Sequence, residues 1–77
     1  MNWKRSETER ARRTFADNLN RLMEVKQITP AEMCSAVSVS KTAVSFWRNA
    51  QAIPCIANLE ALAAFLGVST EDLLGGK

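Results

Sequence analysis

The sequence predicts an all-α fold, a compact bundle of five helices. Hydrophobic residues recur at helical spacing, and no segment shows the alternation that is typical of a strand. The same helix-starting pattern occurs three times along the chain. The chain has only three glycines and two prolines and lacks tyrosine, which argues against a turn-rich β fold. With 77 residues there is room for one domain around one core.

The first helix is expected over residues 8–26, and a capping box at Ser6-Glu7-Thr8-Glu9 offers an earlier start. Its apolar stripe has the spacing i, i+4, i+7 and i+8. The stripe consists of Phe15, Leu19, Leu22 and Met23.

Charge is distributed unevenly along the chain. Residues 1–13 carry five basic and two acidic side chains, whereas residues 14–77 carry five basic and six acidic ones. We therefore divide the chain into a basic N-terminal arm, or extension of the first helix, at 1–13 and a folded domain at 14–77. A basic segment of this kind fits a polyanion partner or a solvated helix face, and alone it does not choose between them.

Three further helices have recognisable starts and are expected at 30–37, 41–50 and 70–74. The clearest start is Thr29-Pro30-Ala31-Glu32, in which Thr29 and Glu32 can form a capping box around a proline at the first helical position. Ser40 and Ser69 are expected to cap the other two. Each start has a hydrophobic staple: Ile28 with Met33, Val39 with Val44, and Val68 with Leu73.

The remaining helix is expected over residues 55–66, after Pro54 and before Gly67. Its stripe consists of Ile56, Leu59, Leu62, Ala63 and Leu66. Cys34 and Cys55 are interpreted as two small buried hydrophobes. No metal site is expected, because the chain has no histidine and no CxxC pair.

The turn between the second and third helices is the informative feature. Only about three residues near 37–39 separate them, and so short a turn sets two helices at a steep angle. This predicts a helix-turn-helix at about residues 30–50.

The third helix should have two unlike faces. At 100° per residue, Ala43, Val44, Trp47 and Ala50 fall on one side, which we assign to the core. The opposite side has hydroxyl, amide and cationic groups and no carboxylate, as a surface that meets phosphate requires. This outward face consists of Lys41, Thr42, Ser45, Phe46, Arg48 and Asn49.

Phe46 has two interpretations. A phenyl ring on a solvent face suits an apolar partner such as a thymine methyl in the major groove. Alternatively, a small error in the helix register turns Phe46 inward beside Trp47.

The stretch from Leu19 to Leu74 resembles the Cro/CI-type (XRE-type) helix-turn-helix of lambda-repressor-like domains. The similarity covers about three-quarters of the chain. It is carried by Ile28-Thr29-Pro30-Ala31-Glu32-Met33-Cys34, Val39-Ser40-Lys41-Thr42-Ala43-Val44-Ser45, Pro54, Leu59 and the closing Leu62-Ala63-Ala64-Phe65-Leu66-Gly67-Val68-Ser69-Thr70-Glu71-Asp72-Leu73-Leu74.

This resemblance implies a DNA-binding role for residues at matching positions. Lys41, Thr42, Phe46 and Ser45 are the expected base contacts. The expected phosphate contacts are Thr29, Ser40, Asn49 and Arg48.

The chain also departs from the family pattern. Glycine is common in the family at the positions of Gln27, Ser38 and Ala50, where the backbone can adopt positive φ. Pro30 replaces a frequent phosphate-binding glutamine and has no donor. A frequent arginine–glutamate pair falls on Met23 and Arg48, which leaves Arg48 free to reach solvent or a phosphate.

The expected function is sequence-specific transcriptional regulation, most simply repression, with helix 41–49 in the major groove of a palindromic DNA operator. Two recognition helices would then lie about 34 Å apart in a weak homodimer. The alternative is a protein–protein interaction module of an antitoxin-like or antagonist-controlled kind. An enzyme is not expected, and neither is a cofactor, a metal or a membrane partner; the expected location is cytoplasmic, with the nucleoid. The dimer candidates are Ala52, Ile53, Val68 and Leu74.

Overall fold

The computed structural model describes the backbone of residues 2–75 and the side chains of residues 9–75. All regular structure within residues 2–75 is helical, which confirms the predicted all-α fold. The five helices are α1 (Asn2–Lys26), α2 (Pro30–Val37), α3 (Lys41–Arg48), α4 (Ile56–Leu66) and α5 (Thr70–Leu74).

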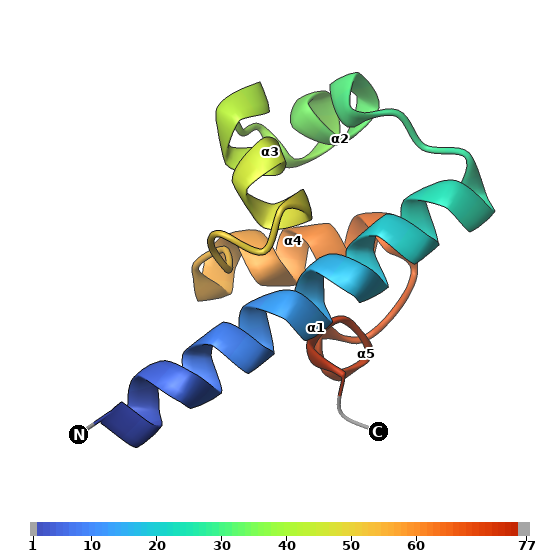
Figure 1. Cartoon of the computed structure of the whole chain (residues 1–77). Helices are drawn as coiled ribbons and strands as arrows, with labels where there is room; N and C mark the ends of the chain where they lie inside the picture. Colours follow the sequence, from blue (N-terminus) through green and yellow to red (C-terminus); the bar gives the residue numbers. More distant parts are fainter. Residues whose placement is uncertain (1, 76–77) are drawn as a thin grey trace.

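The helices form one bundle around the C-terminal half of α1. α1 packs against α3 and α5, α2 packs against α3 and α4, and α4 packs against α5. Figure 1 shows α2 and α3 above α1 and α5 below it, while the N-terminal half of α1 projects beyond the bundle. The projecting half has no apolar stripe in the sequence.

All five helices contribute buried apolar side chains to a single core. Such side chains stabilise the fold by roughly 1.5–3 kcal/mol each relative to leaving them exposed, as an upper estimate. Leu22, from the predicted stripe of the first helix, is only half-buried. The buried set consists of Phe15, Leu19, Met23, Met33, Val37, Val44, Trp47, Leu59, Leu62, Ala63, Leu66 and Leu73.

The predicted helix caps at Thr29, Ser40 and Ser69 are present, whereas Ser6 does not start a helix, because α1 already begins at Asn2. The Thr29 hydroxyl accepts a bond from the Glu32 N–H at 3.1 Å, and the Thr29 N–H donates to the Glu32 carboxylate at 2.9 Å. Ser69 and Asp72 form the same reciprocal box at the start of α5. Ser40 caps α3 by accepting from the Ala43 N–H at 3.1 Å.

Within residues 2–75, three non-glycine residues adopt the left-handed conformation. Gln27, Ser38 and Ala50 have φ values of 58°, 62° and 62°, at the positions where the resemblance implied glycine. The turns therefore keep their shape although the residues differ. Each residue costs about 1–2 kcal/mol relative to a right-handed backbone, and the surrounding helix packing offsets this cost.

A buried amide ties the last helix to the first. Asn18 Nδ2 donates to the carbonyl oxygens of Asp72 and Leu73 at 3.1 and 3.0 Å. Asn18 lies within the apolar stripe of α1, three residues after Phe15 and one before Leu19. The position of Asn18 within an apolar stripe could have indicated from the sequence that its side chain has a hydrogen-bond partner inside the fold.

Several predicted helix ends need correction. α1 begins at Asn2 rather than near residue 8, so the segment 2–13 continues the helix. α3 ends at Arg48 rather than near residue 50, because Ala50 has left-handed φ and cannot extend the helix. α4 begins at Ile56, since the backbone of Cys55 is extended at the cap position.

The prediction that both cysteines are buried is wrong for Cys55. Cys34 is half-buried and packs against the core, but Cys55 is exposed, because it lies at the end of the α3–α4 loop. Ile56, which was expected in the core stripe of this helix, is 69% exposed, whereas Leu59 in the same turn is buried.

None of the described helices could cross a membrane, since none combines sufficient length with sufficient apolar character.

Candidate nucleic-acid interface

Two buried side chains set the orientation of α3. Val44 and Trp47 are 1% and 4% exposed, and Ala43 and Ala50 beside them are half-buried. These are the four residues assigned to the core from the sequence. The predicted register of α3 is therefore confirmed.

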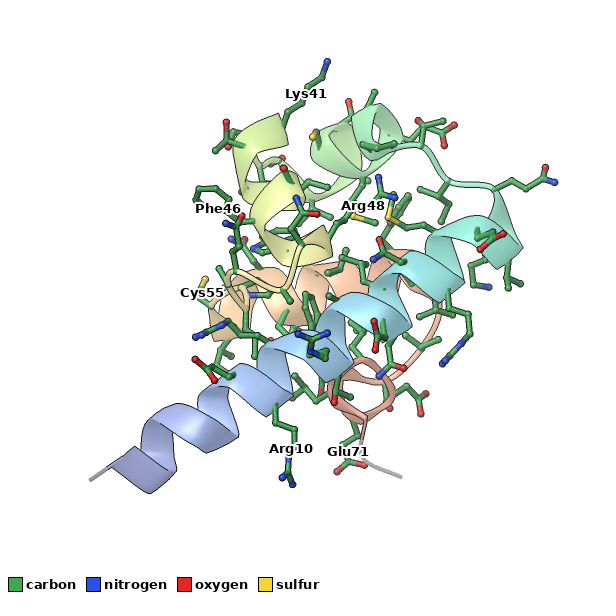
Figure 2. The ribbon with its side chains drawn as sticks, viewed as in Figure 1. Arg10, Lys41, Phe46, Arg48, Cys55 and Glu71 are labelled. Atoms are coloured by element: carbon green, nitrogen blue, oxygen red, sulfur yellow. The ribbon has the colours of Figure 1, made fainter. Side chains whose placement is uncertain are left out.

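The opposite face of α3 is exposed along its whole length. Phe46 is 46% exposed, so the alternative that it turns inward beside Trp47 is wrong. In Figure 2 Lys41 extends from the start of α3 into solvent, while Phe46 and Arg48 point to opposite sides of the helix. No acidic side chain occurs between residues 40 and 50. The exposed residues are Lys41, Thr42, Ser45, Phe46, Arg48 and Asn49.

The first turn of α3 contains no carboxylate. Ser40 supplies the side-chain cap, and the position that closes the capping box in α2 and α5 is Ala43 here. The partial positive charge of this helix end is consequently not neutralised from within its own first turn. A helix end in this state favours an approaching anion.

Thr29 is more constrained than the sequence suggested. Its N–H is taken by the Glu32 carboxylate, and its hydroxyl oxygen accepts from the Glu32 N–H. Only the hydroxyl proton remains to donate to a phosphate, and a carboxylate stands next to it. This position is therefore a weaker anion contact than Ser40, whose cap has no acidic partner.

Arg48 is exposed, as expected from the missing glutamate partner, but it has a different partner in α1. Its Nε donates to Asn20 Oδ1 at 2.7 Å, and Asn20 Nδ2 donates to the Arg48 carbonyl oxygen at 3.1 Å. Sequence reasoning missed Asn20, because an asparagine on the polar side of a long helix has no local pattern that marks its partner.

The structure brings together some of the predicted contact residues and separates others. A hollow lies between α3, α1 and the start of α2, and Thr42 and Phe46 are outside it. Thr29 and Arg48 both border a second, neighbouring hollow. The predicted contacts that line the first hollow are Lys41, Ser45, Arg48 and Asn49.

α2 and α3 are joined by a short turn, and α3 has one face buried in the core and the other exposed to solvent. This arrangement defines a helix-turn-helix domain. Residues 18–76 match the family of Cro/C1-type HTH DNA-binding domains, and the chain belongs to this family. Its fold and its resemblance to lambda-repressor-like domains are thereby confirmed, and it is a DNA-binding domain by family.

One similar curated protein is a transcriptional regulator. The chain is 29% identical over 63 residues to the HTH-type transcriptional activator BcrR of Enterococcus faecalis. The match covers 82% of this chain but only 31% of BcrR, so the chain corresponds to less than half of that relative. No solved structure gives a significant match to the chain.

Proposed function

We propose that this domain is a sequence-specific transcriptional regulator that inserts α3 into the major groove of DNA. The observation that carries the proposal is the outward face of α3, which is exposed along its length, free of carboxylates and backed by the buried side chains of Val44 and Trp47. A helix whose exposed face combines several hydrogen-bond donors with one apolar ring suits direct readout of base edges.

Within this proposal the roles follow the position of each residue on α3 and around its start. Lys41, Thr42, Ser45 and Phe46 contact bases, since they lie on the exposed side from the first to the second turn. Backbone phosphates are contacted by Thr29, Ser40, Arg48 and Asn49. No catalytic or cofactor role is assigned; the function is binding, at the nucleoid in the cytoplasm.

The mode of binding is proposed to be a weak homodimer on a palindromic operator. Ala52, Ile53 and Val68 are half-buried against the core of their own chain, and Leu74 is 40% exposed. Only a small apolar area remains for a partner, which suits a dimer that assembles mainly on DNA. Sedimentation velocity with and without the duplex tests this: a tight dimer without DNA would contradict it.

The direction of regulation is proposed to be repression by occlusion, since this needs only occupancy of a promoter. BcrR is described as an activator, so a regulator of the opposite sign is the competing outcome. A reporter gene with the selected site placed over or upstream of its promoter distinguishes the two.

The basic segment is proposed to add affinity without sequence preference. Glu9, Arg10, Arg12 and Arg13 line a hollow together with Ala50, which places this charge beside the end of α3. Changing the three arginines to glutamine should weaken binding to all sequences alike. The slope of log affinity against log salt should fall by about 0.9 for each phosphate that these arginines neutralise. An unchanged slope would mean that the segment points away from DNA.

The proposed function is tested by selecting binding sites from random duplexes and measuring affinity for the selected site at two salt concentrations. Sequence-specific DNA binding requires a strong preference for the selected site and a steep loss of affinity with salt. If neither is found, the exposed Phe46 favours the second candidate, a protein–protein interaction module of antitoxin-like or antagonist-controlled kind.

A further inference from the structure

Asn20 and Arg48 form a reciprocal bridge between α1 and the last turn of α3. Arg48 Nε donates to Asn20 Oδ1 at 2.7 Å, and Asn20 Nδ2 donates to the Arg48 carbonyl oxygen at 3.1 Å. The two residues are 28 positions apart. The bridge therefore fixes a side chain and the main chain of the recognition helix at once, from outside that helix.

The bridge uses only one of the donor groups of the Arg48 side chain. A guanidinium is planar and carries five donor hydrogens, of which the Nε–H is the one bound to Asn20. Among the residues that the structure describes, the Arg48 side chain makes its one hydrogen bond through Nε, which leaves both Nη groups available. A planar group held at Nε presents its Nη donors in a defined direction, which is the arrangement that binds a phosphate with two parallel bonds.

Arg48 borders a hollow whose chemistry suits an anion. In Figure 2 the side chain of Arg48 points from α3 toward α1, on the side opposite Phe46. The hollow has a volume of about 370 Å³ and no acidic residue in its lining. Its lining includes Asn20, Pro30, Lys41, Ser45, Arg48 and Asn49.

The start of α2 provides no donor to this hollow. Pro30 has neither an N–H nor a polar side chain. The Glu32 carboxylate is held at the Thr29 N–H and does not line the hollow. Asn49 is held in place by its bond to the Ser45 hydroxyl at 3.2 Å. Of the two cations that line the hollow, Lys41 and Arg48, it is Arg48 whose side chain is held by a hydrogen bond among the described residues.

We propose that this hollow receives one phosphate of the DNA backbone, bound by Arg48, and that Asn20 is the positioning residue that directs Arg48 toward it. The inference rests on the proposed function, because it requires α3 to lie against a duplex. Holding the guanidinium before DNA arrives reduces the side-chain entropy lost on binding, so a residue that touches no DNA contributes to affinity.

The test compares Asn20→Ala, Arg48→Ala and the double variant by DNA affinity as a function of salt, using the site selected for the unmodified chain. Arg21→Ala is the control for Arg48→Ala, because Arg21 is exposed and donates to Asn18 on the side of α1 that faces α5. Asn58→Ala, at a half-buried position of α4, is the control for Asn20→Ala.

Arg48→Ala should lower affinity at least roughly tenfold, as expected for the removal of the charged hydrogen bonds to one phosphate, and reduce the salt slope by about 0.9. Asn20→Ala should give a smaller loss in the same direction, although the net charge is unchanged. In the Arg48→Ala background, Asn20→Ala should have no further effect on binding. Both control variants should remain within about twofold of the unmodified chain.

Two results would overturn the inference while leaving the proposed function intact. One is a variant Asn20→Ala that binds like the unmodified chain. The other is an Asn20→Ala loss that persists in the Arg48→Ala background, because it would reflect a general displacement of α3. If the unmodified chain itself shows no salt-dependent DNA binding, the proposed function fails instead, and the three results remain distinguishable.

A scan with neutral methylphosphonate linkages locates the contact on the duplex. The unmodified chain should lose affinity at the linkage that occupies the hollow, whereas Arg48→Ala and Asn20→Ala should be insensitive there. Sensitivity that is unchanged in both variants would assign that phosphate to another residue and contradict the inference.

Discussion

The turns α2–α3 and α4–α5 are built in the same way. Each contains a residue in the left-handed conformation, then a half-buried valine, then a serine that caps the next helix; the residues are 38–40 and 67–69. The valine N–H closes each preceding helix, with Val39 donating to Cys34 at 3.1 Å and Val68 to Ala63 at 3.0 Å. The two turns therefore have similar backbone conformations and the same hydrogen bond from the valine N–H.

The turns differ at two positions, and the differences match their surroundings. The left-handed residue is Gly67 in the second turn but Ser38 in the first, so the first turn has the higher backbone energy. The serine of the second turn is matched by Asp72, whereas the first has Ala43 at this position. The α4–α5 turn leads into a helix start that has both halves of a capping box. The α2–α3 turn leads into a helix start that has a serine cap but no carboxylate, so the start of α3 can accommodate an anion.

The largest expected effect comes from removing the anchor of the helix that follows each turn. Trp47→Ala should lower the free energy of unfolding by about 3–5 kcal/mol and Leu73→Ala by about 2–5 kcal/mol, because both side chains are buried. Denaturant unfolding followed by circular dichroism measures both. If Trp47→Ala were nearly neutral, α3 would not be held by the core.

The outward face of α3 should show the opposite behaviour. Lys41→Ala, Thr42→Ala and Phe46→Ala should each cost about 1–3 kcal/mol of binding free energy at the affected base pair and alter the selected sequence. Their unfolding free energies should change little, since all three side chains are exposed. Site selection with each variant measures this, and Lys77→Ala should leave the preference intact. Three unaltered preferences would remove α3 from base recognition.

Substitutions at the third helical position of α5 and of α3 should show whether capping and DNA binding are independent. Asp72→Ala should cost about 0.5–2 kcal/mol of stability without changing DNA affinity, because it opens the Ser69 cap away from α3. Ala43→Asp should weaken DNA binding by about 0.3–1 kcal/mol, because it places a carboxylate at the open end of α3. Equal effects of both changes on DNA affinity would contradict the contrast between the two turns.

The smallest effect is expected from the left-handed residues. Gly67→Ala should lower stability by about 1 kcal/mol through the backbone alone, since a Cβ at Gly67 would meet no atom within 4 Å. Ser38→Gly should raise stability by about 0.5 kcal/mol, because relief of the left-handed strain is partly cancelled by the extra freedom of glycine in the unfolded chain. Thermal unfolding of both variants measures the pair. If Ser38→Gly is destabilising, the serine makes a compensating interaction.

The sequence by itself determined the helices, the three serine and threonine caps and the register of α3. These features depend on interactions between residues three or four positions apart, such as Thr29 with Glu32 or Val44 with Trp47, and such interactions can be read from spacing. The assignment of the outward face of α3 followed from the same periodicity.

Only the tertiary structure decided which polar groups meet across the bundle. Asn18 binds carbonyls 54 and 55 positions away, and Asn20 binds Arg48 at a separation of 28. The exposure of Cys55 and Ile56 likewise depends on how far the neighbouring helices extend over the first turn of α4. Such pairings arise from the positions of packed helices relative to one another, which the local sequence does not encode, because a hydrogen bond between distant residues forms only after the core has placed both of them.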